Sequence, residues 1–242
     1  MAVHGVSFSQ KMHFFLDPEF NPKNGVLNPE ESRHAMRVLR LREGDGILIG
    51  NGKGVQYSAE ISEVLKNDVS VNVLSEQVFS APIHRVRVAI SPTKNLGRFE
   101  WFLEKATELG ISEIIPLITS RTQRPRIKEE RSEKIILSAS KQSQRVFIPK
   151  LHPTVSLKEF LETEKNGGLI AHCMDQKERV SISVNPKGSE SLILIGPEGD
   201  FTLEEVEIAE KAGFKGVVLN ENRLRTETAG ILAVAMLQMS NR

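Results

Sequence analysis

Cysteine is almost absent from this chain of 242 residues, which contains only Cys173. One cysteine cannot form an internal disulfide bond or supply a metal site built from several thiolates. The histidines are scattered without the spacing of metal ligands, so we predict no metal. We interpret Cys173 itself as a small buried hydrophobic residue, in a protein of a reducing compartment.

Long hydrophobic runs are also missing. No stretch approaches the roughly 18 to 20 apolar residues that cross a bilayer. The first residues, MAVHGVSFSQ, lack the charged start and apolar stretch of a signal peptide. We therefore expect no membrane partner and a cytoplasmic location. With 39% hydrophobic and 26% charged residues, the composition is typical of a globular protein of one or two domains.

Neither sign of charge dominates, because the formal net charge is +1. A nucleic-acid partner would therefore be attracted by local patches rather than by the field of the whole molecule. One such patch is the basic segment 120–149, which includes Arg121, Arg124 and Arg126. These three arginines are spaced poorly for one helix face, but each guanidinium can grip two phosphate oxygens. The segment therefore favours RNA over an ordinary solvated face.

Residues 13–75 predict a small β-barrel or sandwich. Short alternating segments, HFFLD, GILIG, QYSAEISEV and SVNVL, are separated by turn signals. The glycine-rich GNGKG at 50–54 resembles a phosphate-binding loop, but its place between two strands favours a hairpin turn. A helical segment, PEESRHAMRVLRLREGD, interrupts the strands. Its basic residues either form a solvated face or contact phosphates, and both interpretations stay open for Arg33, His34, Arg37 and Arg40.

The pattern changes at residues 75–84, SEQVFSAPIH, which we interpret as a linker. The domains are thus predicted as 1–78 and 79–242. Beyond the linker, strand patterns such as RVRVAI, EIIPLI and LILIG alternate with helical ones, which predicts an α/β domain with a mostly parallel sheet. Its first helix is expected to end at Gly110 and to bury an apolar stripe of Phe99, Phe102, Leu103, Ala106 and Leu109.

LILIGPEGDFTLEE predicts a buried strand, a glycine turn and a helix capped by Thr202 and Glu205. Such a turn lies at the sheet edge where α/β proteins bind ligands. Four acids at this helix start would repel a polyphosphate: Glu198, Asp200, Glu204 and Glu205. They either stay solvated and complement the helix dipole, or recognise a cation with hydroxyl groups, such as S-adenosylmethionine.

A second strand-exit loop, LNENRLRTETAG at residues 219–230, precedes a helix that is apolar all round. The two loops together could form one pocket. Arg225 and Glu227 flank Thr226, either as an ordinary ion pair or as functional groups. Thr226 or Thr228 is expected to cap the helix.

Five ordered stretches carry a family resemblance: SRHAMRVLRLREGD, SPTKNLGRFEWFLEKATELG, KQSQRVFIP, LIGPEGDFTLEE and LRTETAG. They resemble the RsmE family of ribosomal RNA methyltransferases, within the SPOUT superfamily. The resemblance implies an N-terminal PUA-like β-barrel that helps to grip RNA and a C-terminal SPOUT α/β domain with a trefoil knot. It further implies a homodimer that binds S-adenosylmethionine in the knot. The implied reaction is methylation of N3 of one uridine of 16S rRNA in the assembled small ribosomal subunit.

The resemblance also assigns residues to roles. The cofactor loops correspond to Gly196, Pro197, Glu198, Gly199, Leu219, Asn220, Leu224, Arg225 and Thr226. Arg225 would offset negative charge on the uracil and Glu227 would take the N3 proton. RNA would be gripped by Arg33, His34, Arg37, Arg40, Lys94, Arg121, Arg124 and Arg145. Two rival functions stay open: a non-catalytic RNA-binding assembly factor, and a methyltransferase of another RNA nucleotide.

The chain departs from the family pattern at several places. The family commonly has glycine where this chain has Asp200, often has glycine at Asn220, and has an EQSGR-like run where this chain has KQSQR. The Asp200 difference bears on the conformation of that turn. The family also tends to begin near MHFF, so residues 1–11 are interpreted as an extension.

Overall fold

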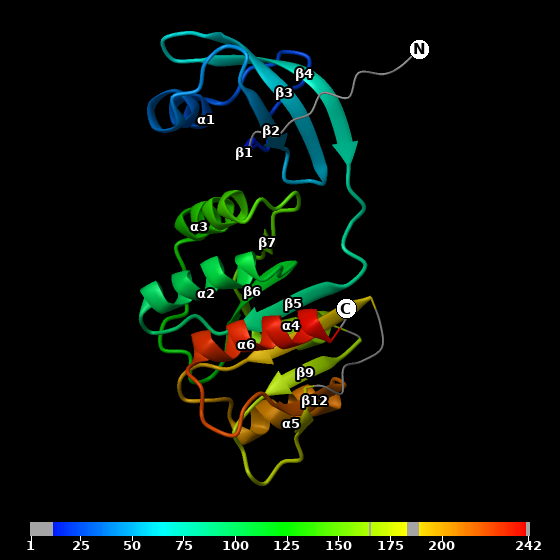
Figure 1. The fold of residues 1–242 in the computed structure, drawn as a ribbon. Helices are drawn as coiled ribbons and strands as arrows, with labels where there is room; N and C mark the ends of the chain where they lie inside the picture. The colour runs from blue at the N-terminus through cyan, green and yellow to red at the C-terminus, as the bar shows by residue number, and fades with distance from the viewer. Residues whose placement is uncertain (1–11, 165, 183–188, 241–242) are drawn as a thin grey trace. The chain divides into compact units, whose positions relative to one another are not determined.

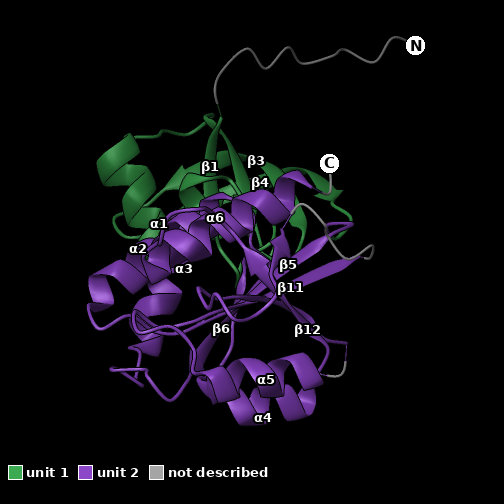
Figure 2. Ribbon diagram, turned by 90° about the horizontal axis from the view of Figure 1, so that it is seen from below, with its two compact units in different colours: residues 1–81, 140–147 green, residues 82–139, 148–242 purple. Residues whose placement is uncertain are grey.

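The computed structural model describes residues 12–164, 166–182 and 189–240, so the interpretation of residues 1–11 lies outside this range. The described chain divides into two compact units (Figure 2). The first contains the residues up to Ala81 together with Ser140–Phe147, and the second contains Pro82–Ala139 and the residues from Ile148 onward. This division differs from the single cut predicted after residue 78. A cut at one point cannot represent a segment that returns to the first unit much later in the chain.

The four predicted strands of the first unit are confirmed. They are β1 (His13–Leu16), β2 (Gly46–Gly50), β3 (Val55–Val64) and β4 (Val69–Val78), in the order β1-β2-β3-β4. β1 runs parallel to β2, and the other neighbours are antiparallel. The interpretation of GNGKG as a hairpin turn is also confirmed, because it joins β2 to β3 and the Asn51 side chain accepts hydrogen bonds from the amides of Lys53 and Val55.

The linker prediction was wrong for residues 75–78, which are the end of β4 and pair with β3. These residues are exposed, so polar side chains are tolerated on both faces and the alternation that marks a strand is lost. The hydrophobic core of this unit lies between the sheet and the neighbouring segments, and it includes Phe15, Ile47, Ile49, Ile61 and Val71.

The helical segment that interrupts the strands consists of two short helices. α1 (Pro29–Arg33) begins at Asn28, whose side chain accepts from the amides of Glu30 and Glu31. A π-helix, η1 (His34–Leu39), follows and ends at Arg40, which adopts a positive φ of 56°. Lys141 lies 2.7 Å from the Glu31 carboxylate, and this ion pair helps to hold 140–147 in the first unit.

A parallel sheet forms the second unit, as predicted. Its strands are β5 (Arg85–Ile90), β6 (Glu113–Ile118), β7 (Lys150–Leu151), β9 (Gly168–Ala171), β10 (Val180–Ser181), β11 (Glu190–Ile195) and β12 (Phe214–Val218). Their order is β10-β12-β9-β11-β5-β6-β7, and β8 (Val155–Ser156) pairs with β6. The two-residue strands β7, β8 and β10 were not predicted, because two residues carry no periodicity.

Helices cover both faces of this sheet (Figure 1). α2 (Leu96–Glu108), α3 (Glu129–Gln142) and α6 (Thr226–Met239) contribute to the core on one face. α4 (Leu157–Thr163) and α5 (Leu203–Lys211) contribute to the core on the other. α2 buries the predicted stripe except Leu109, which is 40% exposed. Leu109 lies beyond the last helical turn, where Gly110 at a φ of 100° changes the direction of the chain.

Candidate functional site

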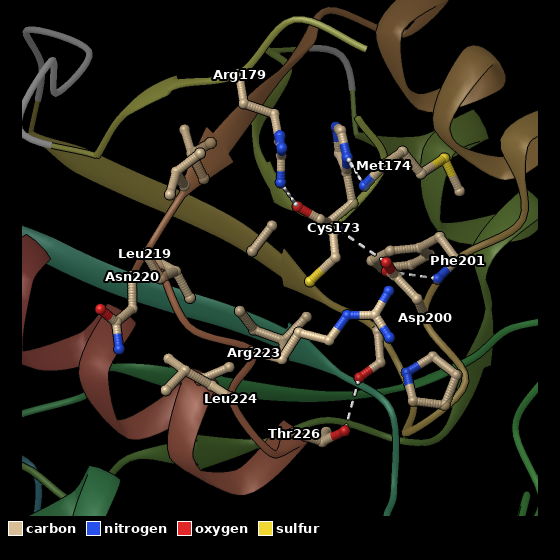
Figure 3. Close-up of a pocket in the computed structure, with 18 of the residues that line it drawn as sticks. Cys173, Met174, Arg179, Asp200, Phe201, Leu219, Asn220, Arg223, Leu224 and Thr226 are labelled. Atoms are coloured by element: carbon tan, nitrogen blue, oxygen red, sulfur yellow. Dashed lines mark hydrogen bonds between the residues drawn. The ribbon is translucent and has the colours of Figure 1, made fainter. Parts of the chain in front are cut away.

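The carboxyl ends of the parallel strands open into one cavity of about 650 Å³ (Figure 3). Parallel strands leave the sheet in the same direction, so the loops after β6, β9, β11 and β12 meet at one edge. All four loops contribute residues to the cavity, as does the first turn of α6. The two strand-exit loops that the sequence singled out therefore do form one pocket.

The turn after β11, residues 196–200, forms one wall. The amide of Asp200 donates to the carbonyl of Pro197 at 2.9 Å, which closes the turn. A side chain at Gly196 would place its Cβ 3.0 Å from the ring of Phe201, which is fully buried. Glycine at 196 thus lets the backbone pass close to that ring.

Three of the four acids beside this turn accept hydrogen bonds from backbone amides of other loops. Glu198 accepts from the amide of Lys94, after β5, at 2.9 Å. Glu205 accepts from the amide of Ser120, after β6, at 2.7 Å. Glu205 also completes the predicted capping box of α5 with Thr202. These carboxylates therefore hold neighbouring loops, which neither interpretation of the acidic cluster had foreseen.

Asp200 makes the same kind of connection to the loop after β9. Its Oδ2 accepts from the amide of Cys173 at 2.8 Å, and its Oδ1 accepts from the amide of Phe201 at 2.8 Å. Asp200 is one of the few non-glycine residues at positive φ in the described chain, with a φ of 62°. The remaining acid of the four, Glu204, is exposed.

Arg121 lies against the same turn. Its Nη1 donates to the carbonyl of Gly199 at 2.7 Å and to that of Phe201 at 3.3 Å. The side chain lines the cavity, whereas the sequence placed it among RNA-gripping residues. Lys94 and Arg124, from the neighbouring loops, are exposed.

The loop after β12 supplies the opposite wall through Leu219, Asn220 and Leu224. Thr226 joins the two walls, because its Oγ1 donates to the carbonyl of Gly196 at 3.1 Å. The prediction that Thr226 or Thr228 caps α6 was wrong. The N-cap is Arg225, whose guanidinium has no acceptor for a capping bond, and Thr226 donates to the other loop instead. The predicted cofactor residues that line the cavity are Gly196, Pro197, Glu198, Gly199, Leu219, Asn220, Leu224 and Thr226.

The remaining predicted cofactor residue, Arg225, and the predicted base Glu227 line a different, shallower hollow. It has a volume of about 480 Å³ and is completed by Gly97, Arg98, Trp101 and Thr228. One helical turn separates the two spaces, with Thr226 and Ala229 on one side and Glu227 on the other.

Glu227 does not form the ion pair with Arg225 that the sequence left open. Glu227 is 5% exposed, and its Oε1 lies 3.7 Å from Nε of Arg98. Its Oε2 is buried without a hydrogen-bond partner among the described residues. A carboxylate in this state is costly to bury, so it is ready to accept a hydrogen bond from a group that enters the hollow.

Sequence reasoning missed the loop after β9, which lines the cavity with His172, Cys173, Asp175 and Arg179. Cys173 is exposed, so its interpretation as a buried hydrophobic residue was wrong. The residues GLIA form β9, and the rule that ligands bind at strand ends would have pointed to the polar residues after it.

His172, in contrast, is 5% exposed. Burial lowers the pKa of His172, so the ring is neutral at physiological pH. The ring Nδ1 accepts from the amide of Met174 at 3.3 Å, which places the remaining proton on Nε2.

The other predicted RNA-binding residues lie in the first unit. Arg33, Arg37 and Arg40 are exposed on α1, on η1 and after it. His34 and Arg145 are half-buried. Burial lowers the pKa of His34, and it lowers that of Arg145 to about 10, which leaves the guanidinium charged at neutral pH.

Two features are absent from the residues that the structure describes. No helix among them has the length and apolar character to cross a membrane. Nor do they contain a group of three or more His, Cys, Asp and Glu side chains arranged to hold a metal ion. The absence of a metal stays a prediction.

Comparison with known proteins identifies the family to which the chain belongs. Residues 80–238 match the RNA methyltransferase domain family, and residues 27–74 match the RNA methyltransferase PUA domain family. The ribosomal RNA small subunit methyltransferase E of Rickettsia conorii is 30% identical over 222 residues, which cover 90% of this chain and 91% of that protein. The chain belongs to the ribosomal RNA small subunit methyltransferase E family. The fold is therefore an α/β RNA methyltransferase domain with an N-terminal PUA domain.

Solved structures agree with membership of this family. A protein from Porphyromonas gingivalis has 35% identity and a TM-score of 0.87, covering 96% of this chain and 100% of that chain. The ribosomal RNA small subunit methyltransferase E from Neisseria gonorrhoeae, bound to S-adenosyl methionine, has 28% identity and a TM-score of 0.81. That alignment covers 95% of this chain and 98% of the other.

Proposed function

We propose that the chain transfers a methyl group from S-adenosylmethionine to N3 of one uridine of 16S rRNA, within the assembled small ribosomal subunit in the cytoplasm. The observation that carries this proposal is the cavity where residues 196–200 and 219–226 meet, joined by the bond from Thr226 to Gly196. Family membership supports it, as does the related structure from Neisseria gonorrhoeae, which is bound to the same cofactor.

The residues present fit that cofactor. A cavity of about 650 Å³ has the size of sites for nucleoside-sized ligands. Leu219 and Leu224 offer apolar surface for a base, and the carboxylate of Asp175 favours a ligand with positive charge and hydroxyl groups. Gly196, Pro197, Glu198, Gly199, Asn220 and Thr226 would complete the contacts. When bound, S-adenosylmethionine supplies a methyl group on a positively charged sulfur.

The chain's own residues prepare the acceptor. N3 of uracil carries a proton that must leave before the nitrogen can form a new bond. We assign this proton to the Glu227 carboxylate, whose Oε2 has no partner among the described residues. Arg225, in the same hollow, offsets the negative charge that develops on the uracil carbonyl. Transfer requires N3 and the methyl carbon in contact, so the uracil would lie at the first turn of α6, which borders both the hollow and the cavity.

Two properties of the family are included in the proposal. The first is a homodimer, which is supported by large apolar side chains exposed on or just after α2 and at the end of α6: Trp101 at 46%, Leu109 at 40% and Met239 at 73%. Light scattering at increasing protein concentration tests it.

The second property is a trefoil knot at the cofactor loops. It is compatible with β12 lying beside β9, while the segment that follows β12 reaches the turn after β11.

Mass spectrometry of ribosomal RNA tests the reaction. A strain that lacks the gene should lose one N3-methyluridine from 16S rRNA, and expression of the intact protein should restore it. Loss of a different modification would identify another target nucleotide. Unchanged RNA, together with no binding of S-adenosylmethionine in calorimetry, would favour a non-catalytic assembly factor and reject the proposal.

The proton acceptor is tested separately with Glu227→Gln. We expect cofactor affinity to stay the same, because Glu227 lies outside the cavity, while methylation of isolated small subunits falls at least about a hundredfold. Thr228→Val, in the same hollow, is the control and should keep its rate. Normal turnover by Glu227→Gln with cofactor bound would exclude Glu227 as the base.

A further inference from the structure

Asp200 joins two loops that border the cofactor cavity. Its backbone belongs to the turn after β11, and its Oδ2 accepts from the amide of Cys173, after β9, at 2.8 Å. Both residues line the cavity (Figure 3). Among the side-chain hydrogen bonds found for the described residues 171–176, this is the one that reaches the turn after β11.

The backbone conformation of Asp200 is unusual for a residue other than glycine. A φ of 62° is the left-handed region, which glycine adopts freely and which most other residues avoid. Aspartate tolerates it better than most, because its short polar side chain can bond to nearby backbone. Here Oδ1 does so, accepting from the amide of Phe201 at 2.8 Å. That bond fixes the side chain, so that Oδ2 faces Cys173.

The other wall contacts of the turn are made by different residues. Glu198 holds the loop after β5, Arg121 and Glu205 hold the loop after β6, and Thr226 holds the loop after β12. Asp200 therefore has a separate partner among the loops around the cavity. Its removal should release the loop after β9 while the other three connections remain.

We propose that Asp200 is a positioning residue that fixes residues 172–175 against the turn 196–200 and so preorganises the cavity for its adenosyl ligand. This inference rests on the proposed function for the identity of the ligand. Ligand binding to a preorganised site avoids the entropy of ordering a loop, so the free protein gains affinity from a connection that need not touch the ligand.

The chain contains its own reporter for this loop. Cys173 is the single cysteine and is exposed, so a thiol reagent reports on residue 173 alone. Figure 3 shows its sulfur directed toward the middle of the cavity. Labelling of the ligand-free protein by a chromogenic disulfide measures the loop without reference to catalysis. Hydrogen exchange at the amide of Cys173 measures the bond itself.

Three variants separate positioning from charge. Asp200→Gly keeps the backbone conformation available and removes the carboxylate. Asp200→Asn removes the charge and keeps one oxygen, which can accept from the amide of Cys173 or from that of Phe201 but not from both. Glu204→Gln is the matched control, since Glu204 belongs to the same acidic cluster but is exposed and does not line the cavity.

The variants are compared by calorimetry with S-adenosylmethionine and with its uncharged-sulfur product, S-adenosylhomocysteine. We expect Asp200→Gly to weaken both ligands by about tenfold, the loss of one charge-assisted hydrogen bond. Labelling of Cys173 and exchange of its amide should become faster in the same variant. Asp200→Asn should lose less affinity than Asp200→Gly, and Glu204→Gln should bind both ligands as the original protein does.

Affinities for Asp200→Gly within about twofold of the original protein would overturn the inference. So would a loss confined to S-adenosylmethionine, since that result would assign the effect to the charge of the ligand. If the original protein bound neither ligand, the proposed function would fail. The labelling and exchange rates would still show whether Asp200 holds the loop, so the two failures are distinguishable.

Discussion

At the residue scale, the carboxylates beside the cavity act mainly on the backbone of other segments. Glu198, Asp200 and Glu205 each accept an amide from a different strand-exit loop. A hydrogen bond to an ionised acceptor is stronger than a neutral one, and it leaves the cavity wall with little freedom. The same short stretch thus caps a helix and assembles a pocket.

Thr226 makes the corresponding connection with a hydroxyl group. Thr226→Val keeps the shape of the side chain and removes the donor to the Gly196 carbonyl, which is 3.1 Å away. We expect the free energy of unfolding to fall by about 1 kcal/mol and cofactor affinity to fall several-fold. Urea denaturation and calorimetry measure the two effects. Thr226→Ser should behave as the original protein, and equal stability of Thr226→Val and Thr226→Ser would contradict the assignment.

Glu113 illustrates a carboxylate at the opposite edge of the sheet. It is 8% exposed, lies 2.7 Å from Nε2 of His152 and 3.4 Å from Nε of Arg87, and pairs with Arg85. Burial acts to raise the pKa of Glu113, but the hydrogen bond from His152 and the charges of Arg87 and Arg85 outweigh it, so the pKa lies below its ordinary value of 4.5.

This shift makes stability depend on pH. Because the folded pKa is below the unfolded one, the stabilisation is present above about pH 4.5 and is lost as the pH falls through the folded value. Glu113→Gln should lower the free energy of unfolding at pH 7 by about 1 kcal/mol, because Arg85 is half exposed and Arg87 keeps its pairs with Glu164 and Glu190. In this variant, the free energy of unfolding should also depend less on pH under acidic conditions. The exposed Glu130→Gln, which breaks a surface pair with Lys134, serves as the control and should change little.

At the element scale, α6 combines an apolar sequence with close packing. It contacts α2 and β5, and its residues Ala233, Val234 and Leu237 are fully buried. Its first turn also separates the cavity from the hollow, so the register of this helix decides which side chain faces which space. The close approach of α6 to α2 depends on a small residue at 230.

Gly230→Ala tests that packing. The added Cβ would lie 2.7 Å from Cε2 of Phe102 and 2.8 Å from Cδ1 of Ile90, and both side chains are fully buried. We expect a loss of about 1 to 3 kcal/mol in the free energy of unfolding, although alanine favours a helix more than glycine does. Thermal and urea unfolding measure it. Phe102→Leu in the same chain should recover part of the loss, and a stabilised Gly230→Ala would show that the helices can move apart.

At the scale of the whole molecule, the net charge of +1 leaves RNA attraction to local groups. Arg124 is exposed in the loop after β6, next to the cavity residue Arg121. In Arg124→Ala, we expect the slope of log affinity for small subunits against log salt to fall by about 0.7 to 0.9, the value for one phosphate contact. Filter binding at several salt concentrations measures the slope. Lys158→Ala removes an exposed cation from α4, on the other face of the sheet, and should leave the slope unchanged.

Much of the architecture could be predicted because long elements repeat their pattern. The stripe of Phe99, Phe102 and Leu103 predicted α2, and the caps Thr202 and Glu205 predicted the start of α5. Elements of two residues have no such repeat, and β7, β8 and β10 were missed. The return of residues 140–147 to the first unit could not be predicted either, because the interactions that hold it join positions far apart in sequence, such as Lys141 with Glu31.

The sequence by itself determined the parallel α/β class, a first domain of short strands and the two loops that meet at the cavity. Those properties depend on local periodicity, on glycine positions and on the order of the motifs, all of which can be read from the sequence. The tertiary structure alone decided that Arg225 and Glu227 lie in a separate hollow, that Cys173 is exposed and that Asp200 holds the amide of Cys173. Each of these depends on the strand order β12-β9-β11 or on the rotation of α6, and both are set by packing between distant segments.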